Sequence, residues 1–219
     1  MHIAIVKLSA LGDVVHALPS AAALRREISD VRITWIVEKG SAGILRNSPA
    51  IDRLIELDTR AWRRHLLRRG TQRELMARLS SLRAEPIDVA LDMQGLLKSG
   101  VVAYATGAAR RVGFASGALR EPASRAFLNE QVEVDDHGHV IEKNLALVRH
   151  LGVNVDGAYE FPIVVPPTAE ASVAERVGDR GFAILNPGGG WWTKLWPAAR
   201  FGQLADRIFE EHNLESLVT

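Results

Sequence analysis

The chain has 219 residues, of which 47% are hydrophobic and 24% charged, and its formal net charge is +1. This composition is typical of a globular protein with a buried core. It contains no cysteine, which excludes disulfides and thiolate metal sites, and no apolar run approaches the length of a membrane span.

The first predicted element is a strand at residues 2–6, a short apolar run. A Ser-Ala-Leu-Gly-Asp turn follows, and apolar residues at helical spacing then predict a helix over 12–27. A strand, a glycine turn and a helix open a parallel α/β domain, in which ligands bind just outside the carboxyl ends of the strands. Ser9, Gly12 and Asp13 occupy that place. At the start of a helix, Asp13 is either an N-cap or a catalytic base.

The rest of the chain alternates in the same way. Further strands are predicted at 32–37, 88–92, 110–114, 161–165 and 182–186, and further helices at 72–83, 96–105, 137–151, 167–178 and 197–211. This alternation predicts an α/β fold with a doubly wound parallel sheet.

Prolines within 161–168 predict a boundary between two domains. Residues 1–165 form the first domain, which has an ordinary domain size. Residues 166–219 contain only a linker, one strand, one loop and one helix before a final strand-like run at 215–219. We therefore expect the second domain to be incomplete.

Three segments carry a resemblance to a known family. The first, residues 7–19, has the pattern K-x-S-x-L-G-D-V-V-H-A-L-P. The second, residues 92–99, has the pattern D-x-Q-G-L-x-K-S, and the third, residues 186–197, ends in K-x-W-P. Together and in this order they resemble the lipopolysaccharide heptosyltransferases, and most closely the heptosyltransferase I branch. The resemblance runs over the whole chain.

The resemblance implies a GT-B fold, with a Rossmann-like acceptor-binding domain followed by the start of a Rossmann-like domain for the nucleotide sugar. It implies inverting transfer of L-glycero-D-manno-heptose from ADP-heptose to Kdo of Kdo-lipid A, in the inner core of lipopolysaccharide. Asp13 matches the proposed base of the family, and Ser9 and Gly12 shape the turn on the acceptor side. Neither a cofactor nor a metal is expected.

The third segment matches the family's loop for the donor diphosphate, whose candidate residues are Gly189, Gly190, Thr193 and Lys194. Glycines let the backbone approach a ligand closely, and a helix beginning near Pro197 would favour an anion. Without the resemblance, an ordinary glycine-rich turn is the simpler interpretation. The loop departs from heptosyltransferase I, because glycines and two tryptophans stand where hydroxyl-bearing residues are expected before the lysine.

By family position, the candidates for binding the anionic acceptor are Arg60, Arg63, Arg64, Arg120 and His139. Residues 60–69 hold five arginines and no acidic residue, a composition that suits phosphates and carboxylates. The alternative is a solvated basic helix face. With Trp62 and two leucines on its apolar side, the segment also suggests peripheral contact with the cytoplasmic face of the inner membrane. No signal peptide is visible, so we expect a cytoplasmic protein.

Two alternatives stay open. The chain could belong to heptosyltransferase II or another family member, or it could be a non-catalytic fragment that binds an anionic glycolipid. A nucleic-acid partner is disfavoured, because the arginine run lacks interleaved aromatic residues. The histidines at 137 and 139 have no clear third ligand, which argues against a metal site.

Overall fold

The computed structural model spans residues 1–219 and describes all of them except 60–76, 79, 116, 179, 189–192 and 194. The chain divides into two compact units, Met1–Val164 and Val165–Thr219. This division falls inside the proline-rich segment 161–168. Among the described residues, no helix is both long enough and apolar enough to cross a membrane.

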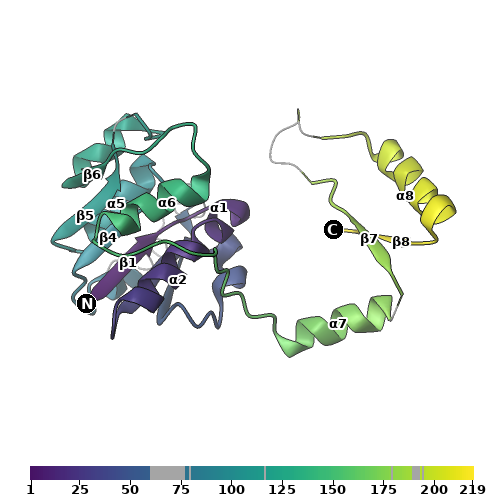
Figure 1. Ribbon diagram of the computed structural model, residues 1–219, viewed down its shortest axis with the longest axis horizontal. Coiled ribbons are helices and arrows are strands. Elements are labelled where there is room, and N and C mark those ends of the chain that lie inside the picture. The colour runs from purple at the N-terminus through teal and green to yellow at the C-terminus, as the bar shows by residue number, and fades with distance from the viewer. Residues whose placement is uncertain (60–76, 79, 116, 179, 189–192, 194) are drawn as a thin grey trace. The chain divides into compact units, whose positions relative to one another are not determined.

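The first unit is built on one six-stranded sheet in which every strand pair is parallel. The strands are β1 (His2–Val6), β2 (Arg32–Glu38), β3 (Arg53–Leu57), β4 (Val89–Asp92), β5 (Arg110–Phe114) and β6 (Glu130–Val132). They lie in the order β3-β2-β1-β4-β5-β6, and Figure 1 labels β1, β4, β5 and β6 of this sheet. The order reverses between β1 and β4, so the crevice that binds ligands in such sheets lies beyond the ends of these two strands.

Helices connect the strands of the first unit. The α-helices are α1 (Leu11–Val15), α2 (Leu18–Glu27), α5 (Leu97–Ala105) and α6 (Val140–Arg149), and the 3-10 helices are η1 (Lys39–Leu45) and η2 (Pro122–Phe127). Residues 77, 78 and 80–82 are also helical. Together with the parallel sheet, these helices confirm the predicted α/β fold.

Alternate residues of β1 enter two different cores, because side chains along a strand point to opposite faces. Ile3 and Ile5 pack in the same core as the apolar faces of α2 and α6. Ala4 and Val6 pack on the other face, in the same core as residues of α5. The side chains of these four residues of β1 are fully buried. Both faces of the sheet are therefore covered, and β1 is fixed at its centre.

The second unit contains α7 (Pro167–Val177), β7 (Phe182–Leu185), α8 (Ala198–His212) and β8 (Glu215–Val218). The two strands pair in parallel, with Phe182 opposite Glu215, and α8 is the connection between them. This is a single βαβ unit. Its sheet leaves large apolar side chains exposed, such as Ile184 at 63% and Val218 at 68%.

Two of the predicted elements are wrong in detail. The predicted strand at 161–165 has no regular secondary structure, because prolines within and directly after it cannot donate ladder hydrogen bonds. The predicted helix over 12–27 is two helices, α1 and α2. Pro19 lacks an amide hydrogen, which interrupts a continuous helix but suits the first turn of a new one.

Candidate active site at the carboxyl ends of the strands

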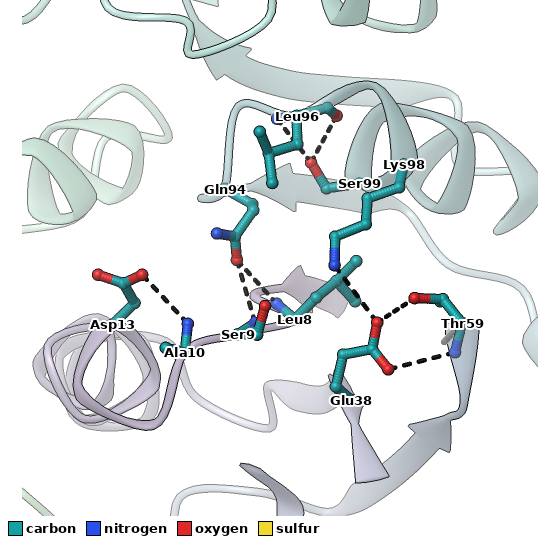
Figure 2. Close-up of polar contacts among 10 residues, drawn as sticks. All are labelled: Leu8, Ser9, Ala10, Asp13, Glu38, Thr59, Gln94, Leu96, Lys98 and Ser99. Carbon is teal, nitrogen blue, oxygen red and sulfur yellow. Dashed lines mark hydrogen bonds and ion pairs between the residues drawn. The ribbon is translucent and has the colours of Figure 1, made fainter. Parts of the chain in front are cut away.

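Asp13 is the third residue of α1, directly after the turn that leaves β1. Its Oδ2 accepts a hydrogen bond of 3.1 Å from the backbone N–H of Ala10 (Figure 2). Oδ2 also lies 4.0 Å from Nη1 of Arg120. The side chain of Asp13 keeps 24% of its surface exposed, and Oδ1 accepts no hydrogen bond from the part of the chain that the structure describes. The carboxylate therefore closes the first turn of α1 and still has one oxygen available.

The ends of β1 and β4 are tied together in both directions. Oε1 of Gln94 accepts hydrogen bonds from the backbone N–H groups of Leu8 at 3.1 Å and Ser9 at 3.2 Å (Figure 2). In return, Nζ of Lys7 donates to the carbonyl oxygen of Met93 at 2.5 Å. These contacts hold the turn that carries Ser9 and Asp13 against the end of β4.

Lys7 is a buried cation beneath this turn, with 3% of its surface exposed. Burial lowers the pKa of its ammonium group to about 8, and the nearby carboxylate of Asp13 opposes that shift. Lys7 therefore has a structural partner in Met93 and also contributes positive charge to the floor of the site.

Asp92 organises the turn after β4. Its Oδ1 accepts hydrogen bonds from the backbone N–H groups of Gln94 at 3.0 Å and Gly95 at 3.2 Å, and its Oδ2 lies 3.0 Å from the hydroxyl of Ser99. The side chain is fully buried, and this burial raises the pKa of the carboxyl group. Gly95 has a φ of +68°, a conformation that favours glycine. The structure thus gives Asp92 a positioning role.

Lys98 extends from the first turn of α5 to Glu38, the last residue of β2. The ammonium nitrogen lies 3.3 Å from Oε1 of Glu38 (Figure 2). The same carboxylate accepts hydrogen bonds from the backbone N–H of Thr59 at 3.2 Å and from its hydroxyl group. Sequence reasoning missed Glu38. A glutamate that ends an otherwise apolar strand is the signal that could have found it, because a buried carboxylate requires a partner.

The described acceptor-side candidates lie at the same end of the sheet. The backbone N–H of Glu121 donates to the carbonyl oxygen of Gly95 at 3.1 Å, which holds the segment of Arg120 against the loop after β4. His139 is the N-cap of α6, and its Nδ1 accepts from the N–H of Ile141 at 3.3 Å. Its ring meets that of His16 edge to face, with centroids 5.4 Å apart.

Arg60, Arg63 and Arg64, the remaining predicted acceptor residues, lie outside the described residues. The same holds for three of the four donor-loop candidates, Gly189, Gly190 and Lys194.

In the donor loop, Thr193 is described and exposed. Nearby, the side chain of Asn186 accepts from the N–H of Gly188 at 3.0 Å. Pro197 is the N-cap of α8, whose first residue is Ala198. Among the described residues, no group of three or more His, Asp or Glu side chains could hold a metal ion.

Comparison with known proteins gives the chain a family. The model of glycosyltransferase family 9 (heptosyltransferase) matches residues 76–215. Lipopolysaccharide heptosyltransferase 1 of Pseudomonas aeruginosa PAO1 is 30% identical over 217 residues, which cover 96% of this chain and 58% of that protein. The enzyme of the same name from Escherichia coli K12 is 31% identical over 147 residues, which cover 67% of this chain and 46% of that protein.

Solved structures agree with this match. E. coli heptosyltransferase WaaC with ADP-2-deoxy-2-fluoro heptose has a TM-score of 0.83 at 24% identity, and the match covers 100% of this chain and 68% of that one. WaaC with ADP has a TM-score of 0.79 at 25% identity, over 100% of this chain and 67% of that one. These likenesses confirm the predicted GT-B type of fold.

The chain spans a little over half the length of its P. aeruginosa relative. The family model covers more than half of the chain, and the segments 7–19, 92–99 and 186–197 resemble the same family. The chain therefore belongs to glycosyltransferase family 9, the heptosyltransferases.

Proposed function

We propose that the chain is part of an enzyme that transfers L-glycero-D-manno-heptose from ADP-heptose to Kdo of Kdo-lipid A. The observation that carries this proposal is the position of Asp13. Its carboxylate stands just beyond the end of β1, at the switch point of the sheet. One oxygen accepts from Ala10, and the other accepts no hydrogen bond from any residue that the structure describes. A base at this place can take a proton from an acceptor hydroxyl group.

In the proposed reaction, the acceptor hydroxyl gives its proton to Oδ1 of Asp13 as its oxygen attacks the anomeric carbon of the heptose. A new carbon–oxygen bond forms, and the bond between the anomeric carbon and the diphosphate oxygen breaks. ADP leaves with the electron pair of that bond. Because attack and departure occur on opposite faces of the sugar, the anomeric configuration inverts.

Cations on the acceptor side support an anionic acceptor. Arg120 is 62% exposed and lies beside Asp13, so its guanidinium group can meet a carboxylate or phosphate of the incoming glycolipid. We assign His139 and the three arginines at positions 60, 63 and 64 to the same task, with Ser9 and Gly12 forming the turn beneath the acceptor. The arginine segment would also bring the protein to the cytoplasmic face of the inner membrane.

For the donor, we assign Gly189, Gly190, Thr193 and Lys194 to the diphosphate of ADP-heptose. Support comes from the start of α8 directly after this loop, because the N-terminus of a helix favours an anion. The proposed reaction uses no metal. Heptosyltransferase II is the alternative within the family, and the curated relatives reported above carry the name of heptosyltransferase 1 instead.

Calorimetric titration of the 219-residue chain tests the substrate classes. We expect a soluble Kdo-bearing acceptor to bind, and to bind more weakly when Arg120 is replaced by alanine. An acceptor that carries heptose on Kdo serves as the comparison. Tighter binding of the heptosylated acceptor would favour heptosyltransferase II, and binding of neither would contradict the acceptor assignment.

A further inference from the structure

The side-chain amide of Gln94 is held in one orientation. Its Oε1 faces two backbone donors, the N–H groups of Leu8 and Ser9, at 3.1 and 3.2 Å (Figure 2). Turning the amide by 180° would place the Nε2 donor against these two donors and would lose both hydrogen bonds. The oxygen therefore faces β1, and the orientation of the nitrogen follows from it.

The backbone of Gln94 is fixed as well. Its N–H donates to Oδ1 of the buried Asp92 at 3.0 Å, and the preceding carbonyl, of Met93, accepts from Lys7 at 2.5 Å. The residue as a whole is only 5% exposed. Contacts to the ends of both β1 and β4 therefore fix Gln94 in place. Such preorganisation is expected of a residue whose side chain must hold one polar group in a defined position toward a ligand.

The Nε2 group of Gln94 has a different environment. It donates no hydrogen bond to any of the residues that the structure describes, yet it is not one of the fully buried polar atoms that lack a partner. Figure 2 shows it turned away from Leu8 and Ser9, toward the side on which Asp13 lies. As far as the described residues go, two N–H donors therefore lack a partner at the switch point, close to the turn that carries the proposed base.

We propose that Gln94 contacts the acceptor: its Nε2 donates a hydrogen bond to an oxygen of the acceptor sugar, beside the hydroxyl that Asp13 deprotonates. This inference rests on the proposed function. It assigns two tasks to the two ends of one amide. The oxygen ties the Ser9 turn to β4, and the nitrogen helps to orient the acceptor for attack.

Two substitutions separate these tasks. Gln94→Glu keeps oxygens that accept from Leu8 and Ser9 but removes the N–H donors, whereas Gln94→Met has a similar length and removes both functions. Gln131→Glu is the matched control, because it makes the same chemical change at an exposed residue of β6. Hydrogen exchange at the amides of Leu8 and Ser9 reports on the tie and does not depend on any substrate.

We expect Gln94→Glu to leave both amides as protected as in the wild type and to weaken binding of a soluble Kdo-bearing acceptor roughly ten-fold. Gln94→Met should lose the protection and weaken acceptor binding at least as much. The Gln131→Glu control should change neither measurement. To separate contact from charge repulsion, the titration is repeated with a neutral acceptor whose carboxylate is reduced to an alcohol, and the weakening by Gln94→Glu should persist.

Wild-type affinity of Gln94→Glu for the acceptor would overturn the inference, as would a weakening that disappears with the neutral acceptor. Loss of amide protection in Gln94→Glu would overturn the assigned division of tasks. If the wild-type chain binds no Kdo-bearing acceptor, the proposed function fails first and this contact fails with it. If the wild type binds and Gln94→Glu binds equally well, only the contact is wrong.

Discussion

The guanidinium group of Arg120 lies 4.0 Å from the carboxylate of Asp13, although the two residues are far apart in the sequence. Asp13 follows β1, and Arg120 lies between β5 and η2. The hydrogen bond from Glu121 to the carbonyl of Gly95 holds the Arg120 segment against the loop after β4. Gln94 of that loop accepts a hydrogen bond from Ser9, in the turn that carries Asp13. A cation beside the proposed base can hold an anionic acceptor close to the carboxylate that receives its proton.

The first prediction concerns Arg120. We expect Arg120→Ala to weaken binding of a Kdo-bearing acceptor by about five-fold or more, because a charge-assisted hydrogen bond is lost. Binding of ADP should be unchanged. Arg125→Ala is the control, since Arg125 is also exposed but lies in the last turn of η2. Calorimetry measures both ligands, and equal effects of Arg120→Ala on the two would contradict the assignment.

Because Lys7 is buried, we expect the free energy of unfolding to rise at alkaline pH. Burial lowers the pKa of Lys7 from 10.5 to about 8 in the folded protein. Between these two values the unfolded chain holds a proton that the folded protein has released, so the free energy of unfolding increases with pH. Compared with Lys7→Met, the wild type should gain roughly 1–2 kcal/mol between about pH 7.5 and pH 9.5.

Urea unfolding of wild type and Lys7→Met at several pH values measures this difference. The variant also loses the hydrogen bond to Met93, which changes its stability by an amount that is independent of pH. Only the slope of the difference against pH is therefore diagnostic. Parallel curves for the two proteins would show that Lys7 is not desolvated as described.

Because Asp92 is buried, we expect stability to depend on pH in the acidic range as well. Burial raises the pKa of Asp92 above its unfolded value. The folded protein therefore holds the proton more tightly, and this contribution to stability is present at low pH and lost as pH rises through the folded pKa. Asp92→Asn keeps an oxygen for the N–H groups of Gln94 and Gly95 and cannot ionise. In urea unfolding, its stability relative to the wild type should increase as the pH rises above about 4, where the carboxyl group of the unfolded chain ionises.

At Gly100, α5 packs closely against η2. A Cβ atom at this position would lie 2.9 Å from the backbone carbonyl oxygen of Ser124. Gly100→Ala should therefore lower the free energy of unfolding by about 1–3 kcal/mol, because backbone must shift to make room. Gly43→Ala is the control, since a Cβ at Gly43 meets no atom within 4 Å. Equal stability of the two variants would contradict the packing described.

Local patterns were enough to predict the strands β1, β2, β4, β5 and β7, most of which are rich in apolar residues. They did not reveal β3 and β6. The first has two charged residues among its five, and the second has only three residues. Such short strands form because a neighbouring strand is already in place, which is tertiary information.

The placement of Asp13 could be predicted because it depends on a local turn. The contacts of Gln94 could not, since its partners Leu8 and Ser9 lie 86 and 85 positions away in the chain. The link between Lys98 and Glu38 joins β2 to α5 across 60 positions. Residue spacing along the sequence does not predict such pairs. They depend on the order of the strands in the sheet.

The most direct test of the account is heptosyl transfer by wild type and Asp13→Asn, measured as the mass of the acceptor product. It uses ADP-heptose and Kdo-lipid A, with the 219-residue chain and any longer form of the protein that contains it. The substitution keeps an oxygen for the N–H of Ala10, so the fold should be unchanged. We expect transfer by the wild-type active form and a rate lowered at least 100-fold in Asp13→Asn. Equal rates in the two proteins would contradict the role of Asp13 as the base.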